Sequence, residues 1–105
     1  MRINLDEVVV QNNAAAQQYE AIIGGNLALM QYRMAGDTII FTHTKVPEQL
    51  EGQGIGSKLV RMGLDEAKAR GLKVVPACPF VARFIREHPE FQSLIQSSYI
   101  ERVLE

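Results

Sequence analysis

The sequence predicts an α/β fold in which a mixed, twisted sheet begins as an antiparallel meander and ends in a parallel strand pair. The first half of the chain is a series of β-branched and apolar runs separated by Gly and Asn turns. A glycine-rich segment at 51–56 then opens a stretch of helical periodicity, and another short β-branched run follows it. A strand, a helix and a strand in that order form a crossover, which makes the two strands parallel neighbours.

The predicted meander consists of short strands that end at turn residues. Gly24-Gly25-Asn26 supplies the positive φ angles that a tight hairpin needs. Strict alternation places Phe41 and His43 on one face of the last strand, and Thr42 and Thr44 on the other. The three strands of the meander are expected at Gln18–Ile23, Leu27–Arg33 and Thr38–Thr44, and a short β-branched strand at Val8–Val10 precedes them.

The crossover helix is predicted to run from about Ile55 to Arg70. Small and apolar residues recur along it at i, i+4, i+7, i+8 and i+11, which is the spacing of one buried stripe. Gly71 suits the left-handed position that often follows a helix. The later elements are a strand at Lys73–Ala77 parallel to Thr38–Thr44, a short helix at Val81–Glu87 between Pro79 and Pro89, and a helical turn within Phe91–Gln96.

Length and composition limit the class of protein. With 105 residues, the chain is expected to form one domain, 1–105. The net charge of −1 argues against non-specific binding of nucleic acid, and no apolar run is long enough to span a membrane. The lone cysteine, Cys78, cannot form an intrachain disulfide, which favours the cytoplasm. Two histidines and one cysteine argue against a transition-metal site.

The glycine-rich segment is the strongest functional signal in the chain. Gly52, Gly54 and Gly56 alternate with other residues directly before the helix. A loop without Cβ atoms lets its backbone approach a bulky anion, and the first N–H groups of the helix point at the same place. The segment is therefore either a phosphate or pyrophosphate cradle or a glycine-rich turn that merely starts a helix.

Four segments together resemble a known family. They are His43-Thr44-Lys45-Val46-Pro47, Gly52-Gln53-Gly54-Ile55-Gly56, Cys78-Pro79-Phe80-Val81-Ala82 and His88-Pro89-Glu90. The glycine segment, taken from Glu51, is similar to the Arg/Gln-x-x-Gly-x-Gly/Ala signature with which GCN5-related N-acetyltransferases (GNATs) bind acetyl-CoA. The full set resembles a small, single-domain subfamily of these enzymes.

The resemblance implies a compact GNAT-like fold, with acetyl-CoA as co-substrate. In that family the thioester lies in a V-shaped opening between the two parallel strands, and an amine attacks it directly in a ternary complex. Carried over here, Thr44, Lys45 and Val46 would pair with the pantetheine, and a main-chain N–H near Lys45 or Val46 would stabilise the oxyanion. The cofactor-binding loop would consist of Glu51, Gly52, Gln53, Gly54, Ile55, Gly56 and Ser57, with the pyrophosphate on backbone donors from Gln53 to Ser57.

Glu51 departs from the family pattern, because the first position of the signature is usually basic or amidic. A carboxylate beside a pyrophosphate is repulsive, so we expect binding to be retained but weakened. Lys45, Lys58 and Arg61 offset this charge if they face the loop. The alternative is that Glu51 points to solvent and changes little.

Two side chains are candidates for the chemistry of acetyl transfer. Following the family pattern, Cys78 is a general acid for the departing CoA thiolate, a nucleophile that takes the acetyl group first, or a buried small hydrophobe. Many family members use a tyrosine as this acid, and none follows Cys78 closely here. His43 is either a base for an ammonium substrate or a structural histidine.

The sequence leaves two functions open. The first is an acetyl-CoA-dependent N-acetyltransferase whose amine acceptor is a small molecule, a protein or a peptide. The second is a CoA-binding module that senses acyl-CoA without efficient turnover. Larger members of the family carry two helices between their first two strands that help form the acceptor site, and this chain has little there, so the resemblance implies an open acceptor side. The protein is expected to be a monomer or a weak homodimer.

Overall fold

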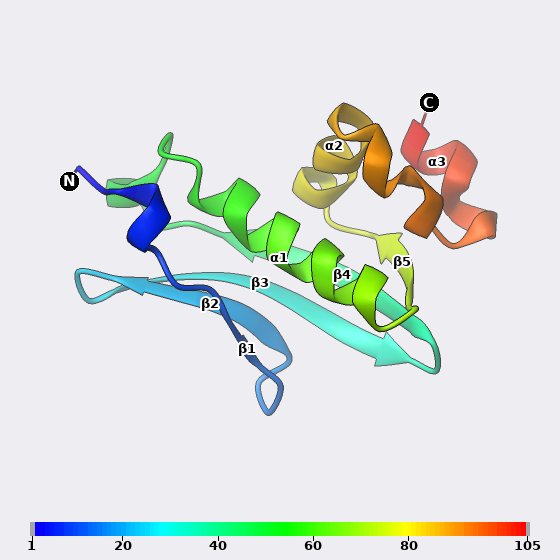
Figure 1. Ribbon diagram of the computed structural model, residues 1–105, viewed down its shortest axis with the longest axis horizontal. Helices are drawn as coiled ribbons and strands as arrows, with labels where there is room; N and C mark the ends of the chain where they lie inside the picture. Colours follow the sequence, from blue (N-terminus) through cyan, green and yellow to red (C-terminus); the bar gives the residue numbers. More distant parts are fainter. Residues whose placement is uncertain (1, 105) are drawn as a thin grey trace.

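A computed structural model describes residues 2–104. Its five strands form one sheet in the order β1-β2-β3-β4-β5, in which the first four are antiparallel neighbours and β5 is parallel to β4 (Figure 1). The strands are β1 (Gln11–Asn13), β2 (Gln18–Ile23), β3 (Asn26–Ala35), β4 (Thr38–Lys45) and β5 (Lys73–Pro76). The predicted fold class, a meander followed by a parallel pair, is confirmed.

The helices lie to one side of the sheet, and the other face carries no helix among residues 2–104 (Figure 1). They are α1 (Ile55–Ala69), α2 (Pro79–Glu87) and α3 (Ile100–Leu104). The stripe expected on α1 is its buried face and packs against β2, β3 and β4. This contact is close: a Cβ at Gly63 would lie 2.6 Å from Cε of Met30 and 3.1 Å from the ring of Phe41, so a larger residue there would require both side chains to shift.

The hairpin turn between β2 and β3 is formed as predicted. Gly24 and Gly25 have φ angles of +56° and +79°, and Ile23 pairs with Asn26. The buried residues of β3 alternate with more exposed ones, as its sequence pattern predicts. Opposite the helices, the sheet leaves Ile22 71% and Leu27 40% exposed, so the face without helices keeps apolar surface in solvent.

Two element predictions are corrected by the structure, and one helix lies outside the prediction. Val8–Val10 is not a strand, although Val8 and Val10 are buried, and the first strand is Gln11–Asn13 instead. The turn within Phe91–Gln96 is a 3-10 helix at Pro89–Leu94, after which Ile95 forms a parallel bridge with Val74. The C-terminal helix α3 is absent from the sequence-based expectation, because its five residues carry too short a pattern to identify.

The alternation expected along β4 is interrupted by a β-bulge. Gln31 pairs with His43, but the next residue, Tyr32, pairs with Phe41, so Thr42 is an extra residue on β4. Thr44 therefore stands opposite the buried Met30 and shares the helix-covered face with Phe41. His43 lies on the other face and is exposed, so the expectation that it shares a face with Phe41 is wrong.

Candidate functional site

The glycine loop ends in an unpaired helix N-terminus. Gly52 and Gly54 have φ angles of +77° and +88°, which residues other than glycine rarely adopt. Gly54 is the N-cap of α1. The first bond of the helix runs from the N–H of Lys58 to the carbonyl oxygen of Gly54 at 3.0 Å. The N–H groups of Ile55–Ser57 thus precede the helical ladder and have no partner in it. Such groups, with the helix dipole behind them, form a binding site for an anion.

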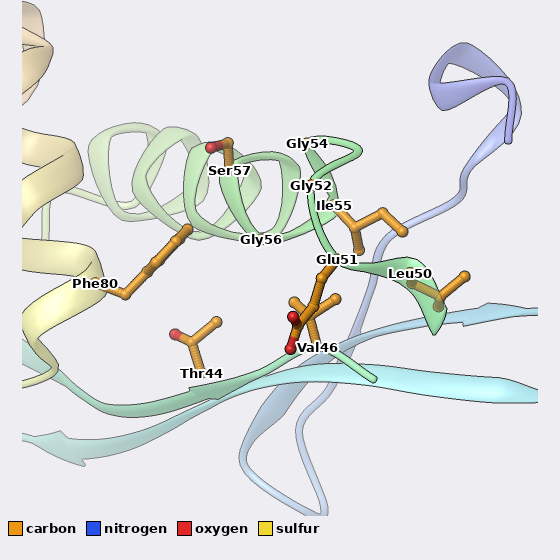
Figure 2. Close-up of a pocket in the computed structure, with 10 residues that line it drawn as sticks. All are labelled: Thr44, Val46, Leu50, Glu51, Gly52, Gly54, Ile55, Gly56, Ser57 and Phe80. Carbon is orange, nitrogen blue, oxygen red and sulfur yellow. The ribbon is translucent and has the colours of Figure 1, made fainter. Parts of the chain in front are cut away.

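A cavity of about 410 Å³ opens in front of these N–H groups. Figure 2 shows that its walls come from the loop and the start of α1, from the end of β4 and from the first residues of α2. Its lining residues are Thr44, Val46, Leu50, Glu51, Gly52, Gly54, Ile55, Gly56, Ser57 and Phe80. Most of these are residues that the sequence assigns to cofactor binding, while Lys45 and Gln53 do not line the cavity.

Two lining residues, Leu50 and Phe80, lie outside the predicted set. Phe80 is 43% exposed, and its ring edge lies against Gly56, where a Cβ would approach Cζ to 2.8 Å. Leu50, in contrast, is fully buried behind the loop. Sequence alone identifies Phe80 only as a core or pocket-wall residue, because its position two residues after Cys78 does not reveal that α2 points it back at α1.

Strands β4 and β5 separate beside this cavity. Their pairing ends at Phe41 and Pro76, and the N–H of Cys78 makes one further bond, to the carbonyl oxygen of Phe41 at 2.9 Å. The bulge at Thr42 lies next to this last bond, so β4 continues to Lys45 without β5 beside it. The main chain of β4 beyond Phe41 is consequently free of β5 on that side.

Thr44 and Cys78 meet where the strands separate. The hydroxyl oxygen of Thr44 lies 3.5 Å from Sγ of Cys78, and either atom is able to donate. Thr44 lines the cavity, whereas Cys78 is 5% exposed and does not. The hydroxyl group thus stands between the thiol and the cavity, in a position to pass a proton from one to the other.

The charged residues around the loop have distinct places. Glu51 lines the cavity, and its side chain extends from the loop toward β4 (Figure 2). Among the predicted compensating cations, Lys58 is held at the loop, where Nζ donates to the carbonyl oxygen of Leu5 at 2.6 Å. Arg61 is directed elsewhere: its guanidinium lies 5.6 Å from the ring centre of Phe84 and 4.0 Å from Glu90.

The structure separates the two catalytic candidates of the sequence. Cys78 stands beside Thr44 at the cavity, but His43, the other candidate, is absent from the cavity lining and exposed on the face without helices. As a base, His43 would therefore have to act from that opposite face, through the gap between the strands. Within residues 2–104, no three His, Cys, Asp or Glu side chains gather as metal ligands, and no helix is long and apolar enough to cross a membrane.

Comparisons with known proteins identify the family and agree with the fold. Residues 18–94 match the family described as GCN5-related N-acetyl-transferase. Protein NATD1 from Danio rerio is 28% identical over 98 residues, which cover 90% of this chain and 84% of that protein. The human Protein NATD1 is 27% identical and covers 90% and 80%, respectively. The solution structure of a GCN5-like protein from Staphylococcus aureus has a TM-score of 0.68 at 23% identity, covering 84% of this chain and 87% of that one.

Proposed function

The chain belongs to the GCN5-related N-acetyltransferase family, and we propose that it transfers the acetyl group of acetyl-CoA to an amine. One observation carries this proposal: a single cavity joins the helix N-terminus to the separated end of β4. A pyrophosphate and a thioester are connected by a pantetheine arm, so a site for both must have an anion cradle at one end and strand backbone at the other. We take residues 1–105 as one acetyl-CoA-binding domain.

In the proposed complex, backbone groups do most of the binding. The N–H groups of Ile55–Ser57 hold the pyrophosphate, and the stretch Thr44–Val46 pairs with the pantetheine in place of a neighbouring strand. A main-chain N–H of Lys45 or Val46 donates to the thioester oxygen. Fixed donors of this kind stabilise the negative charge that develops there during attack.

The acetyl group is transferred directly in this proposal. The lone pair of the amine attacks the thioester carbon, a C–N bond forms, and the C–S bond breaks to release the CoA thiolate. Thr44 gives its hydroxyl proton to the thiolate and recovers one from the thiol of Cys78, since Thr44 stands between that thiol and the cavity. The acceptor enters from the face without helices, where His43 takes the proton that the amine loses.

A second candidate function is a module that binds acyl-CoA without efficient turnover. The observation that favours it is Glu51, whose negative charge lies in the cavity where an anion would bind. Both functions require binding, and only the first requires turnover. Acetylation of a panel of small amines and amine-bearing peptides separates them.

Calorimetric titration with acetyl-CoA and with free CoA tests the proposal. We expect saturable binding by the wild type and none by Gly54→Glu, because that residue has φ +88° and its Cβ would lie 3.1 Å from Cδ2 of Leu5, so a side chain there distorts the loop that forms the anion cradle. Gly36→Glu is the matched control, since Gly36 also has a positive φ, +62°, but no atom lies within 4 Å of the place that its Cβ would take. Absence of binding by the wild type at millimolar acetyl-CoA would refute the proposal.

A further inference from the structure

A segment distant in sequence packs against the glycine loop. The chain preceding β1, blue in Figure 1, runs beside the loop that leads into α1. The N–H of Ile3 donates to Oε1 of Gln53 at 3.1 Å, and Nζ of Lys58 donates to the carbonyl oxygen of Leu5 at 2.6 Å. A Cβ at Gly54 would lie 3.1 Å from Cδ2 of Leu5, so this side chain packs directly on the loop backbone.

This segment, Ile3–Glu7, which we call the strap, is itself fixed. The carbonyl oxygen of Leu5 accepts a second bond, from the N–H of Val8 at 3.2 Å, and Oδ1 of Asn4 accepts from the N–H of Asp6 at 3.1 Å. Val8, the next residue, is buried in the core. The strap is thus anchored to the core at one end, bonded to the loop through Ile3 and Gln53, and bonded to the first turn of α1 through Leu5 and Lys58.

The loop is the part of the site that most needs such support. Gly52 and Gly54 have the largest backbone freedom of any residue type, so ordering them carries a large entropic cost. Gly52 has no atom within 4 Å of the place a Cβ would take, so side-chain packing does not restrain it. If the loop is already ordered in the free protein, the free energy of ligand binding is not reduced by the entropy cost of ordering it.

We infer that the strap is a positioning device that holds the glycine loop in its anion-binding conformation, and that Leu5 and Lys58 are positioning residues of the cofactor site. The effect on affinity rests on the proposed function, whereas the effect on loop order does not. Neither residue lines the cavity, so substitutions there alter affinity only through the loop or its electrostatic field.

Two readouts on the intact chain test this inference. The first is the set of backbone ¹⁵N order parameters of residues 52–57, and the second is the Kd for acetyl-CoA. The test variants are Leu5→Ala, Lys58→Met and Lys58→Arg. Leu72→Ala and Lys68→Met are matched controls, because Leu72 is a partly buried leucine beside the far end of α1 and Lys68 is an exposed lysine in its last turn.

We expect lower order parameters in the loop and a Kd raised about threefold to tenfold in Leu5→Ala and Lys58→Met, the scale of one lost bond or contact. Lys58→Arg should keep both the loop order parameters and the Kd near the wild-type values, because arginine retains a donor for the carbonyl oxygen of Leu5. The double variant should lose less than the sum of the two single losses, since both act through one contact.

The two failures are distinguishable. If loop order and Kd in the test variants equal those of the control variants, the inferred role of the strap is wrong. Tighter binding by the test variants would also overturn it, because the strap would then be a segment that blocks the site. Order parameters that fall as expected in a protein that does not bind acetyl-CoA would uphold the strap and refute the proposed function instead.

Discussion

At the scale of single residues, the pair formed by Thr44 and Cys78 is the sharpest test of the chemistry. If the thiol supplies a proton through the hydroxyl group, Cys78→Ala and Thr44→Val should each reduce the rate of acetyl transfer about 100-fold, the lower end for a lost general acid. The Kd for acetyl-CoA should change little. Steady-state turnover, with calorimetry in parallel, measures the two quantities separately.

The same variants distinguish the direct mechanism from an acetyl-cysteine intermediate. A nucleophilic Cys78 would leave Thr44→Val active and would acetylate the protein when acetyl-CoA is added without an acceptor, which intact mass spectrometry detects. A purely structural cysteine would leave turnover of both variants near that of the wild type. In that case only the melting temperature of Cys78→Ala should fall, because Cys78 is 5% exposed.

Glu51 is a second residue whose effect can be isolated. Replacing it by Gln removes a negative charge from the cavity lining and should tighten binding of acetyl-CoA about fivefold, the effect of ~1 kcal/mol between nearby charges in water. The gain should shrink at high ionic strength because Glu51 is exposed. Calorimetry at low and high salt measures it.

Glu48→Gln is the matched control for Glu51. It removes the same charge three positions earlier, from an exposed residue that does not line the cavity. An equal gain in affinity from both substitutions would mean that only net charge matters. No gain from Glu51→Gln would support the interpretation in which its carboxylate remains in solvent after acetyl-CoA binds.

At the scale of elements, the sequence predicts the longer strands β2, β3 and β4 and the helix α1 well, because their patterns repeat over many residues, whereas it misplaces β1. The meander turns and the buried stripe of α1 are where the pattern puts them. The bulge at Thr42 is different, because one inserted residue in a run of β-formers leaves composition and propensity unchanged. It reverses the faces of His43 and Thr44, and for this reason the sequence identified residues of the site but not the side of the sheet on which they act.

A hydrogen bond between Tyr19 on β2 and Glu66 on α1 predicts how the free energy of unfolding changes at alkaline pH. Oη of Tyr19 donates to Oε1 of Glu66 at 2.8 Å inside the core. Burial, followed by this bond and the nearby carboxylate, raises the pKa of Tyr19 above its ordinary value. The unfolded chain therefore ionises Tyr19 first, so the free energy of unfolding is unaffected below about pH 10 and decreases above it.

The slope from this residue should be about 1.4 kcal/mol per pH unit once the unfolded tyrosine is ionised. Tyr19→Phe should cost about 1–2 kcal/mol at neutral pH, because it removes the bond and leaves Glu66 without this donor. Above pH 10 the variant should lose stability less steeply than the wild type. Urea unfolding at pH 7–11 measures both effects, and parallel pH profiles for the two proteins would contradict this account.

At the scale of the whole molecule, the order of the strands and the crossover follow from sequence, whereas the assembly of the cavity does not. Its walls come from β4, the loop, α1 and α2, and Phe80 reaches Gly56 only because α2 packs beside α1. The strap is a still longer contact, joining residues 50 positions apart. No local pattern encodes such a distance, so these contacts require the folded chain.

Because the cavity is built from segments throughout the chain, a ligand that fills it should stabilise the entire fold. At acetyl-CoA 100-fold above its Kd, stabilisation should be about 2.7 kcal/mol, which corresponds to about 10–20 °C in melting temperature for a domain of this size. Differential scanning calorimetry measures this shift, and Gly54→Glu should abolish it. ADP and pantetheine, each tested alone at the concentration used for acetyl-CoA, should give a small part of the shift, because each occupies only one end of the proposed site and binds more weakly. A full shift with ADP alone would show that the cavity recognises nucleotides in general, and the separated end of β4 would then have no part in binding.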